Sequence, residues 1–146
     1  FYPEADVPVV QLGLNVLQPA AWHWALAEKL RPLRDEGVLI MGSGNIVHNL
    51  RELDFARVDE PFAYDWAEAF RDHINRAILA DDRDTLVNYL ALDDARRAVP
   101  APFEHYLPLL YVLAQRDSGE PVRLFNDEII GGSLSMTAVQ VGARSA

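Results

Sequence analysis

The stretch that decides the fold of this chain is VLIMGSGNIVHNL, which occupies residues 38–50. Its first four residues are apolar, which is too short for an independent helix and typical of a buried strand. Gly42-Ser43-Gly44-Asn45 then breaks the strand, and His48 follows just past the break. In open α/β sheets, ligands bind beyond the carboxyl ends of the strands. His48 is therefore the first residue that we expect to be functional.

The residues before this stretch predict a strand and a helix. Residues 7–14 are mostly apolar and β-branched, which is typical of a buried strand. Pro19 then opens a predicted helix with a buried stripe at helical spacing, formed by Trp22, Leu26, Leu30 and Leu33. Trp24 falls outside this stripe, so we expect it to face a partner or a missing part of the protein. A strand, a helix and the strand at 38–41 form a βαβ unit, which predicts a parallel pair.

The residues after this stretch predict further helices and strands. Residues 64–79 form an amphipathic pattern, and residues 103–113 form an apolar helix that contains Pro108. Residues 121–125 and 133–141 read as two last strands. We therefore predict an α/β fold with a mixed, partly parallel sheet and flanking helices.

Composition limits the classes of partner. The chain has 146 residues and a net charge of -9, from 22 acidic and 13 basic side chains. This negative charge argues against a nucleic acid or an anionic membrane surface as a binding partner, since both attract basic residues. No apolar run is long enough to predict a membrane span, and a cytoplasmic location fits the composition. There is no cysteine, so any metal would need His, Asp or Glu as ligands.

Two histidines stand out by their position. His48 follows a glycine-rich turn, and His105 lies at the start of an apolar helix, where its neighbours offer few polar partners. A charged or metal-bound imidazole is easier to explain at His105 than a core imidazole. The alternatives are a loop histidine that bonds to the backbone at position 48 and a capping histidine at position 105. His23 and His73 lie on amphipathic helices, and we interpret them as structural.

The glycine-rich turn does not predict phosphate binding. It lacks the Lys-Ser/Thr pair of a phosphate loop and the third glycine of a dinucleotide fingerprint. Ser43 is not in a Gly-x-Ser-x-Gly elbow, because Met41 occupies the first glycine position. We therefore expect Gly42 and Gly44 to allow a sharp turn or a close approach of the backbone to a ligand.

Several motifs of the chain resemble the class III extradiol ring-cleavage dioxygenases, in their 4,5-DOPA dioxygenase-like branch. These motifs are PVVQL at 8–12, PAAWH at 19–23, LRDEGVLI at 33–40, GSGNIVHNL at 42–50, PFEHYLPLL at 102–110 and GSLSM at 132–136. The resemblance covers only the C-terminal half of that family's single domain. It implies that residues 1–146 are the C-terminal portion of one catalytic domain, and that the N-terminal portion, with two further metal-ligand histidines, is absent.

The resemblance also implies an activity and a set of site residues. The family uses a mononuclear non-haem Fe(II), or Zn(II) in some members, to open the ring of a catechol with O₂. By motif, His105 matches a metal-ligand histidine, and His48 matches a residue that acts as acid/base or as a further ligand. Asn45 and Tyr106 become candidate substrate-binding residues. Asn45 or Asn49 is also a candidate to fix the tautomer of His48, and Tyr106 suits a core role equally well.

Two alternatives to an extradiol dioxygenase stay open at this point. The first is a non-catalytic metal- or ligand-binding fragment, whose active-site half is missing or is supplied by another chain. The second is a hydrolase that uses the same histidines around zinc and does not need O₂. The expected partners are a small catechol and O₂, together with the missing N-terminal half or a partner chain, and a homo-oligomer is compatible with these expectations.

Overall fold

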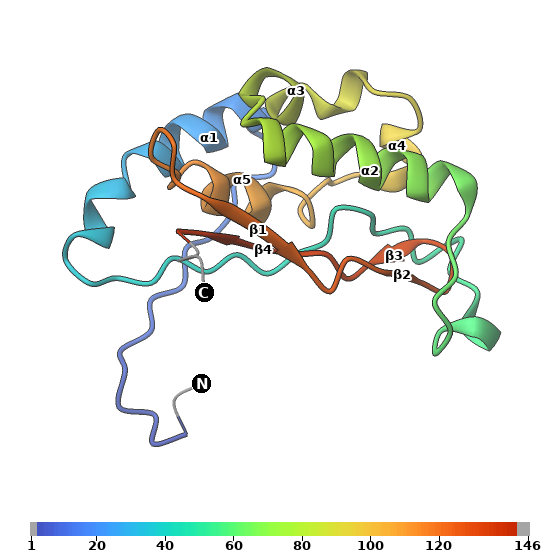
Figure 1. Cartoon of the computed structure of the whole chain (residues 1–146), viewed down its shortest axis with the longest axis horizontal. Helices are drawn as coiled ribbons and strands as arrows, with labels where there is room; N and C mark the ends of the chain where they lie inside the picture. Colours follow the sequence, from blue (N-terminus) through green and yellow to red (C-terminus); the bar gives the residue numbers. More distant parts are fainter. Residues whose placement is uncertain (1–2, 143–146) are drawn as a thin grey trace.

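The computed structural model describes residues 3–142, and Figure 1 shows the α-helices gathered on one side of two small sheets. The α-helices of this part of the chain are α1 (Ala20–Glu28), α2 (Asp65–Ala80), α3 (Arg83–Val87), α4 (Ala95–Ala98) and α5 (Leu107–Leu113). Short 3-10 helices connect them, namely η1 (Arg31–Arg34), η2 (Phe55–Arg57) and η3 (Tyr89–Ala91). None of the helices in residues 3–142 has the length and apolar character needed to cross a membrane.

Two antiparallel sheets of two strands each lie beneath the helices. In the first, β1 (Val122–Phe125) pairs with β4 (Ala138–Val141). In the second, β2 (Ile129–Ile130) pairs with β3 (Leu134–Ser135), which places Ile129 opposite Ser135. Within residues 3–142, parallel pairing is limited to an isolated bridge between Ala63 and Gly132. The predicted α/β class is confirmed, and the sheets that the structure describes are antiparallel.

The two strands predicted at residues 7–14 and 38–41 are not paired with any strand of the described chain. Figure 1 shows the first of these segments running away from the helices. Their apolar side chains face outward, with exposed fractions of 93% for Val10 and 73% for Met41. The predicted βαβ unit is therefore not formed by residues 3–142. A β-branched pattern favours extended backbone, but a strand also needs a neighbour to pair with, and no described segment supplies one.

Helices α2 and α5 follow the sequence pattern closely. The predicted apolar face of α2 is buried, including Phe70 and Ile74. Helix α5 begins at Leu107, four residues later than predicted, because Pro108 occupies its first turn. A proline is tolerated there, since the backbone N–H groups of the first turn have no partner inside the helix.

The buried face of α1 differs from the prediction. Trp24 and Ala27 are buried, whereas Trp22 is 41% exposed. Trp24 faces neither a partner nor a missing part of the protein, because its side chain is 5% exposed and belongs to the core, with its indole Nε1 donating to Glu28 Oε1 at 3.1 Å. The apolar residues of α1 are spread around the helix, so the spacing alone could not decide which side meets the core.

His23 is a structural residue, as predicted. Its ring is fully buried, with Nε2 3.1 Å from Asn15 O and Nδ1 2.9 Å from the Tyr111 hydroxyl. Because a carbonyl only accepts hydrogen bonds, Nε2 carries the proton and Nδ1 accepts from Tyr111. Burial lowers the pKa of His23, which keeps the ring neutral. The His23 ring therefore connects α1 to α5 through its hydrogen bond with Tyr111.

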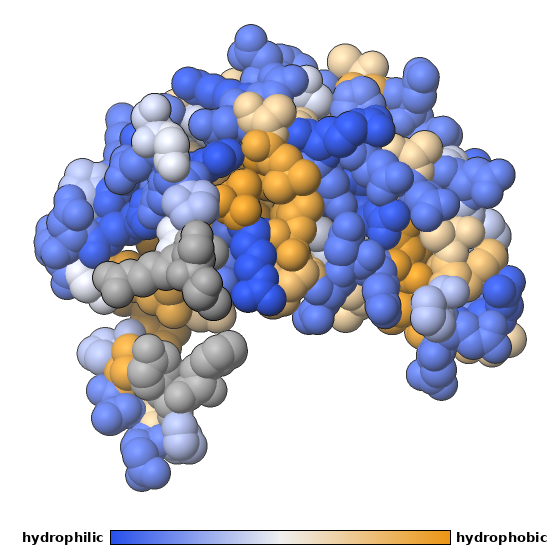
Figure 2. Space-filling model, in the orientation of Figure 1, coloured by the Kyte–Doolittle hydropathy of each residue, from blue (hydrophilic) through white to orange (hydrophobic). Residues whose placement is uncertain are grey.

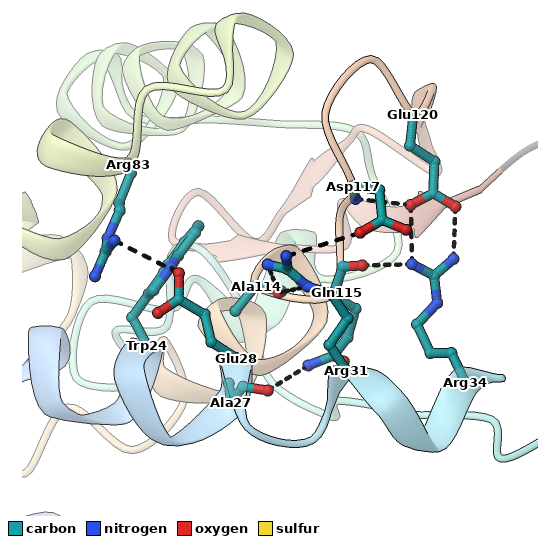
Figure 3. Close-up of polar contacts among 10 residues, drawn as sticks. All are labelled: Trp24, Ala27, Glu28, Arg31, Arg34, Arg83, Ala114, Gln115, Asp117 and Glu120. Atoms are coloured by element: carbon teal, nitrogen blue, oxygen red, sulfur yellow. Dashed lines mark hydrogen bonds and ion pairs between the residues drawn. The ribbon is translucent and has the colours of Figure 1, made fainter. Parts of the chain in front are cut away.

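Two arginines fasten η1 to the end of α5, as Figure 3 shows. Arg31 donates to Ala114 O through Nε at 3.1 Å and through Nη2 at 2.7 Å. Arg34 donates to Gln115 O and forms a two-fold pair with Glu120, at 2.9 Å and 2.5 Å. The last carbonyls of a helix lack partners inside it and attract cations, so both arginines stabilise the end of α5.

We expect Glu120→Gln to lower the free energy of unfolding at pH 7 by about 1 kcal/mol. Its hydrogen bonds with Arg34 lower the pKa of Glu120 to about 2, from an ordinary 4.5. A carboxyl with a lowered folded-state pKa stabilises the fold above its unfolded pKa, and this contribution is lost as the pH falls through the folded value. Urea unfolding at several pH values should show the difference from wild type shrinking below about pH 4.5.

The control for this experiment is Glu60→Gln. Glu60 pairs with Arg57 at 3.2 Å, but both side chains are largely exposed. Exposed pairs contribute little, so the control should change stability by less than about 0.5 kcal/mol. A Glu120→Gln deficit that stays the same from pH 7 to pH 3 would show that the ion pair is not its cause.

Candidate metal centre

His48 lies in a loop that is held on two sides by the backbone. Its N–H donates to Ala98 O at 2.8 Å, just before the segment that leads to His105. On the other side, His48 forms an antiparallel bridge with Leu134 of β3. The loop is largely buried, with exposed fractions of 3% for Ile46 and 0% for Val47. A buried loop must satisfy its backbone polar groups internally, and these bonds do so.

His105 is placed by a close approach of the glycine-rich turn. Asn45 N–H donates to His105 O at 2.9 Å. A Cβ at Gly44 would lie 2.1 Å from His105 O, and a Cβ at Gly42 would lie 2.6 Å from Pro108 O. Both glycines are therefore required for space. The predicted close approach exists, and its neighbour in the structure is the backbone around His105.

The two imidazoles meet face to face. The ring centroids of His48 and His105 are 3.4 Å apart, and their planes differ by 10°. Both rings line a depression of about 140 Å³, to which Arg51 and Glu104 also contribute. Glu104 Oε1 lies 3.7 Å from His105 Nε2. The structure thus brings together the two histidines that the sequence singled out, from segments far apart in the chain.

A second, larger depression has a different character. Its volume is about 420 Å³, and charged side chains dominate its lining, namely Glu28, Arg31, Arg34, Asp35 and Asp117, together with Pro32. The arginines of this depression already bond to the carbonyls that end α5. It contains no histidine, so the smaller depression is the better candidate for metal chemistry.

The pKa of His48 is lowered, first by burial and then by the neighbouring His105. A positive charge on His48 is disfavoured because its ring is partly shielded from water and because the His105 ring lies only a few ångströms away. A neutral imidazole has a free nitrogen lone pair. It can therefore bind a metal or accept a proton, and these are the two roles that the sequence left open for His48.

These residues supply part of a donor set for a transition metal. Imidazole nitrogen suits both Fe(II) and Zn(II). The part of the chain that the structure describes contains no group of three or more His, Cys, Asp or Glu side chains placed to hold one ion. The two histidines therefore fit a metal site in the chemistry of their donors, and a complete site needs further ligands.

The two candidate asparagines are engaged with the chain itself. Asn45 Nδ2 donates to Ser135 O at 2.6 Å. Asn49 Nδ2 donates to Arg97 O at 2.8 Å and to Glu52 Oε1 at 3.1 Å. Neither amide bonds to the His48 ring within residues 3–142. Their observed role is to position the loop that carries His48.

Tyr106 lies in the core. Its side chain is fully buried, and its hydroxyl donates to Leu86 O at 3.1 Å. Its ring stacks on Tyr89, with centroids 3.9 Å apart. Tyr106 does not line the depression that holds the two histidines. Of the two roles that the sequence allowed for Tyr106, the structure places it in the core role.

Sequence reasoning missed Ser133 and Ser135. Both are fully buried, and both hold the loop that carries His48. The only available signal was the alternation in the last predicted strand, where Leu134 and Met136 share one side. The same alternation places the two serines on the opposite side, but it does not reveal that this side is buried.

Known proteins similar to this chain include named dioxygenases. The chain is 43% identical, over 97% of its length, to an Escherichia coli K12 protein named 4,5-DOPA dioxygenase extradiol. A Beta vulgaris protein of the same name is 31% identical over 92% of the chain. The chain is a homologue of these two proteins, both of which are named 4,5-DOPA dioxygenase extradiol. The predicted family resemblance is confirmed, although no family model matches the chain.

A solved structure supports the fold of this dioxygenase homologue. A crystal structure of an uncharacterized Escherichia coli K12 protein matches it with a TM-score of 0.87 and 42% identity. The match covers 97% of this chain and 58% of that chain. The chain likewise spans about half the length of the curated relatives, 52% and 49% for the two above.

We expect Gly44→Ala to disturb His105 more than any other described residue. The added Cβ would meet His105 O, so the turn and the histidine segment must move apart. Overpacking of this kind destabilises by about 1–3 kcal/mol. Thermal unfolding and the NMR shifts of the His105 ring measure the two effects.

The matched control is Gly13→Ala, because a Cβ at Gly13 meets nothing within 4 Å. Equal effects of both substitutions would contradict the steric argument.

Proposed function

We propose that this chain contributes His48 and His105 to the mononuclear metal site of an extradiol dioxygenase. The reaction opens the ring of a catechol-type aromatic substrate beside its two hydroxyls, with O₂ as co-substrate. The observation that carries the proposal is the pair of stacked imidazoles in one depression. Its support is the homology with proteins that are named extradiol dioxygenases.

His105 acts as a metal ligand in this proposal. Its side chain is 37% exposed, so its ring is open to an ion entering the depression. The backbone carbonyl of the same residue is fixed by Asn45 N–H. A ligand held in this way is oriented before the metal arrives, which favours binding. Glu104, which lies beside the ring, provides negative charge at the same rim.

His48 accepts a proton from the catechol, or binds the ion as a second ligand. A catechol that binds a metal through both oxygens loses protons, so a base must lie close to it. The lowered pKa of His48 leaves the ring neutral and able to accept a proton.

The proposed metal is Fe(II), with Zn(II) as the alternative that some relatives are expected to hold. When bound, iron polarises the substrate oxygens and supplies the redox chemistry that O₂ requires. The proposed location is the cytoplasm, with which a sequence that contains no cysteine is compatible.

The remaining metal ligands come, in this proposal, from polypeptide that precedes this chain or from a partner chain. The relatives are about twice as long as this chain, so they have residues to supply them. The outward-facing apolar residues of 7–12 and 38–41 provide a second argument. Val9 and Val10 are 89% and 93% exposed, and Leu39 is 69% exposed. Apolar β-branched segments of this kind are suited to pairing with further strands.

We expect His105→Ala to abolish metal retention in the intact protein, because it removes the proposed ligand. His48→Ala should retain most of the metal and lose turnover if His48 is the base. Metal content after dialysis, and calorimetric titration with Zn(II), measure the first effect. His73→Ala is the matched control, because His73 lies on the exposed side of α2. Equal metal loss in the His48 and His105 variants would instead make His48 a ligand.

Oxygen uptake tests the reaction itself. The chain is combined with the polypeptide that corresponds to the rest of its relatives, and Fe(II) and a catechol are added. We expect O₂ consumption that matches the loss of catechol, and none with His48→Ala. Metal binding without any turnover across a panel of catechols would leave a binding fragment as the function. Turnover that needs zinc but no O₂ would identify a hydrolase.

A further inference from the structure

We propose that Ser135 is a positioning residue that fixes the rings of His48 and His105 relative to each other. The inference builds on the proposed function, since it explains how the two histidines of that site are held. Ser135 lies in β3 and is fully buried. Its backbone and its hydroxyl are bonded to the segments that carry both histidines.

The link to His48 passes through Val47. Ser135 Oγ accepts a hydrogen bond from Val47 N–H at 2.9 Å, and Ser135 N–H donates to Val47 O at 3.0 Å. Val47 is fully buried, so its N–H has no access to bulk water. Because Val47 directly precedes His48, these two bonds fix the position of the His48 backbone beside β3.

The link to His105 passes through Asn45. Ser135 O accepts from Asn45 Nδ2 at 2.6 Å, and Asn45 N–H in turn donates to His105 O at 2.9 Å. One asparagine therefore bonds to Ser135 with its side chain and to His105 with its backbone. The segment that carries His48 is therefore bonded directly to Ser135, and the segment that carries His105 is connected to Ser135 through Asn45.

Ser135 is itself held from the side away from the histidines. It pairs with Ile129 of β2, which is 3% exposed. A neighbouring serine closes the other end of the loop, since Ser133 Oγ donates to Asn49 O at 2.8 Å and Ser133 O accepts from Asn49 N–H at 3.1 Å. A buried hydroxyl is favourable only when it is hydrogen-bonded. The arrangement therefore explains why small polar residues, and not apolar ones, occupy this buried strand.

The test compares Ser135→Ala and Asn45→Ala with wild type in the metal-free chain. The first readout is the nuclear Overhauser effect between ring protons of His48 and His105, which their 3.4 Å stacking makes strong in wild type. We expect both variants to lose most of this signal. The second readout is Zn(II) affinity, which should fall at least about tenfold in both variants, as it does when residues that orient metal ligands are removed.

Two further variants separate positioning from general destabilisation. Tyr111→Phe also removes a buried hydrogen bond, the one to His23, but it lies away from the histidine pair. It should keep the ring-to-ring signal and the Zn(II) affinity even where its loss of stability equals that of Ser135→Ala. Ser135→Thr keeps the hydroxyl oxygen and should recover the signal.

The outcomes are distinct. Retention of the ring-to-ring signal in Ser135→Ala and Asn45→Ala would overturn the inference, and so would its absence from wild type. If Ser135→Ala does not fold, Asn45→Ala decides, because its side chain lies at the partly exposed turn. If wild type shows the signal but binds no Zn(II) even when it is combined with the polypeptide that corresponds to the rest of its relatives, the proposed function fails. The inference is then judged on the ring-to-ring signal alone.

Discussion

The hydrogen bond from Asn45 N–H to His105 O, at 2.9 Å, is the contact on which the candidate site depends. It forms because Gly44 has no side chain to separate the two backbones. Once the glycine-rich turn lies against the start of α5, the chain three residues later delivers His48 to the face of the His105 ring. A single steric requirement at a glycine therefore brings together two histidines from distant parts of the sequence.

This contact would be unstable without β3. The loop from Asn45 to Asn49 is buried, and loops are rarely buried because their backbone polar groups need partners. Here the partners come from Ser133 and Ser135, which bond to the loop with both their backbones and their hydroxyls. β3 thus supports the loop in the way that a neighbouring strand does in a sheet. Where the backbone pairing is irregular, the two serine hydroxyls make the remaining hydrogen bonds.

The sequence predicted those parts of the structure that depend on local patterns. Helix α2 follows from its apolar spacing, and α5 was predicted as a helix, although it begins four residues later than expected because Pro108 occupies its first turn. His48 and His105 were found because each occupies an unusual local setting. Their stacking could not be predicted, since it results from contacts between distant segments. The buried face of α1 was predicted only in part: Leu26 and Leu30 pack against the core, but Trp24 is buried in place of Trp22. The apolar residues surround this helix, so contacts with α5 and α3 decide which side is covered.

The same reasoning explains why residues 7–14 and 38–41 were predicted as strands but are unpaired here. A sequence pattern shows that one segment favours extended backbone, whereas strand pairing depends on two segments. The stacked histidines show the complementary situation, because their segments are held together by hydrogen bonds within residues 3–142. On the proposed function, the site is thus half preorganised, and the missing ligands arrive with the polypeptide that covers the exposed apolar segments. Metal binding and completion of the fold would then be linked, since each brings together the same two parts of the protein.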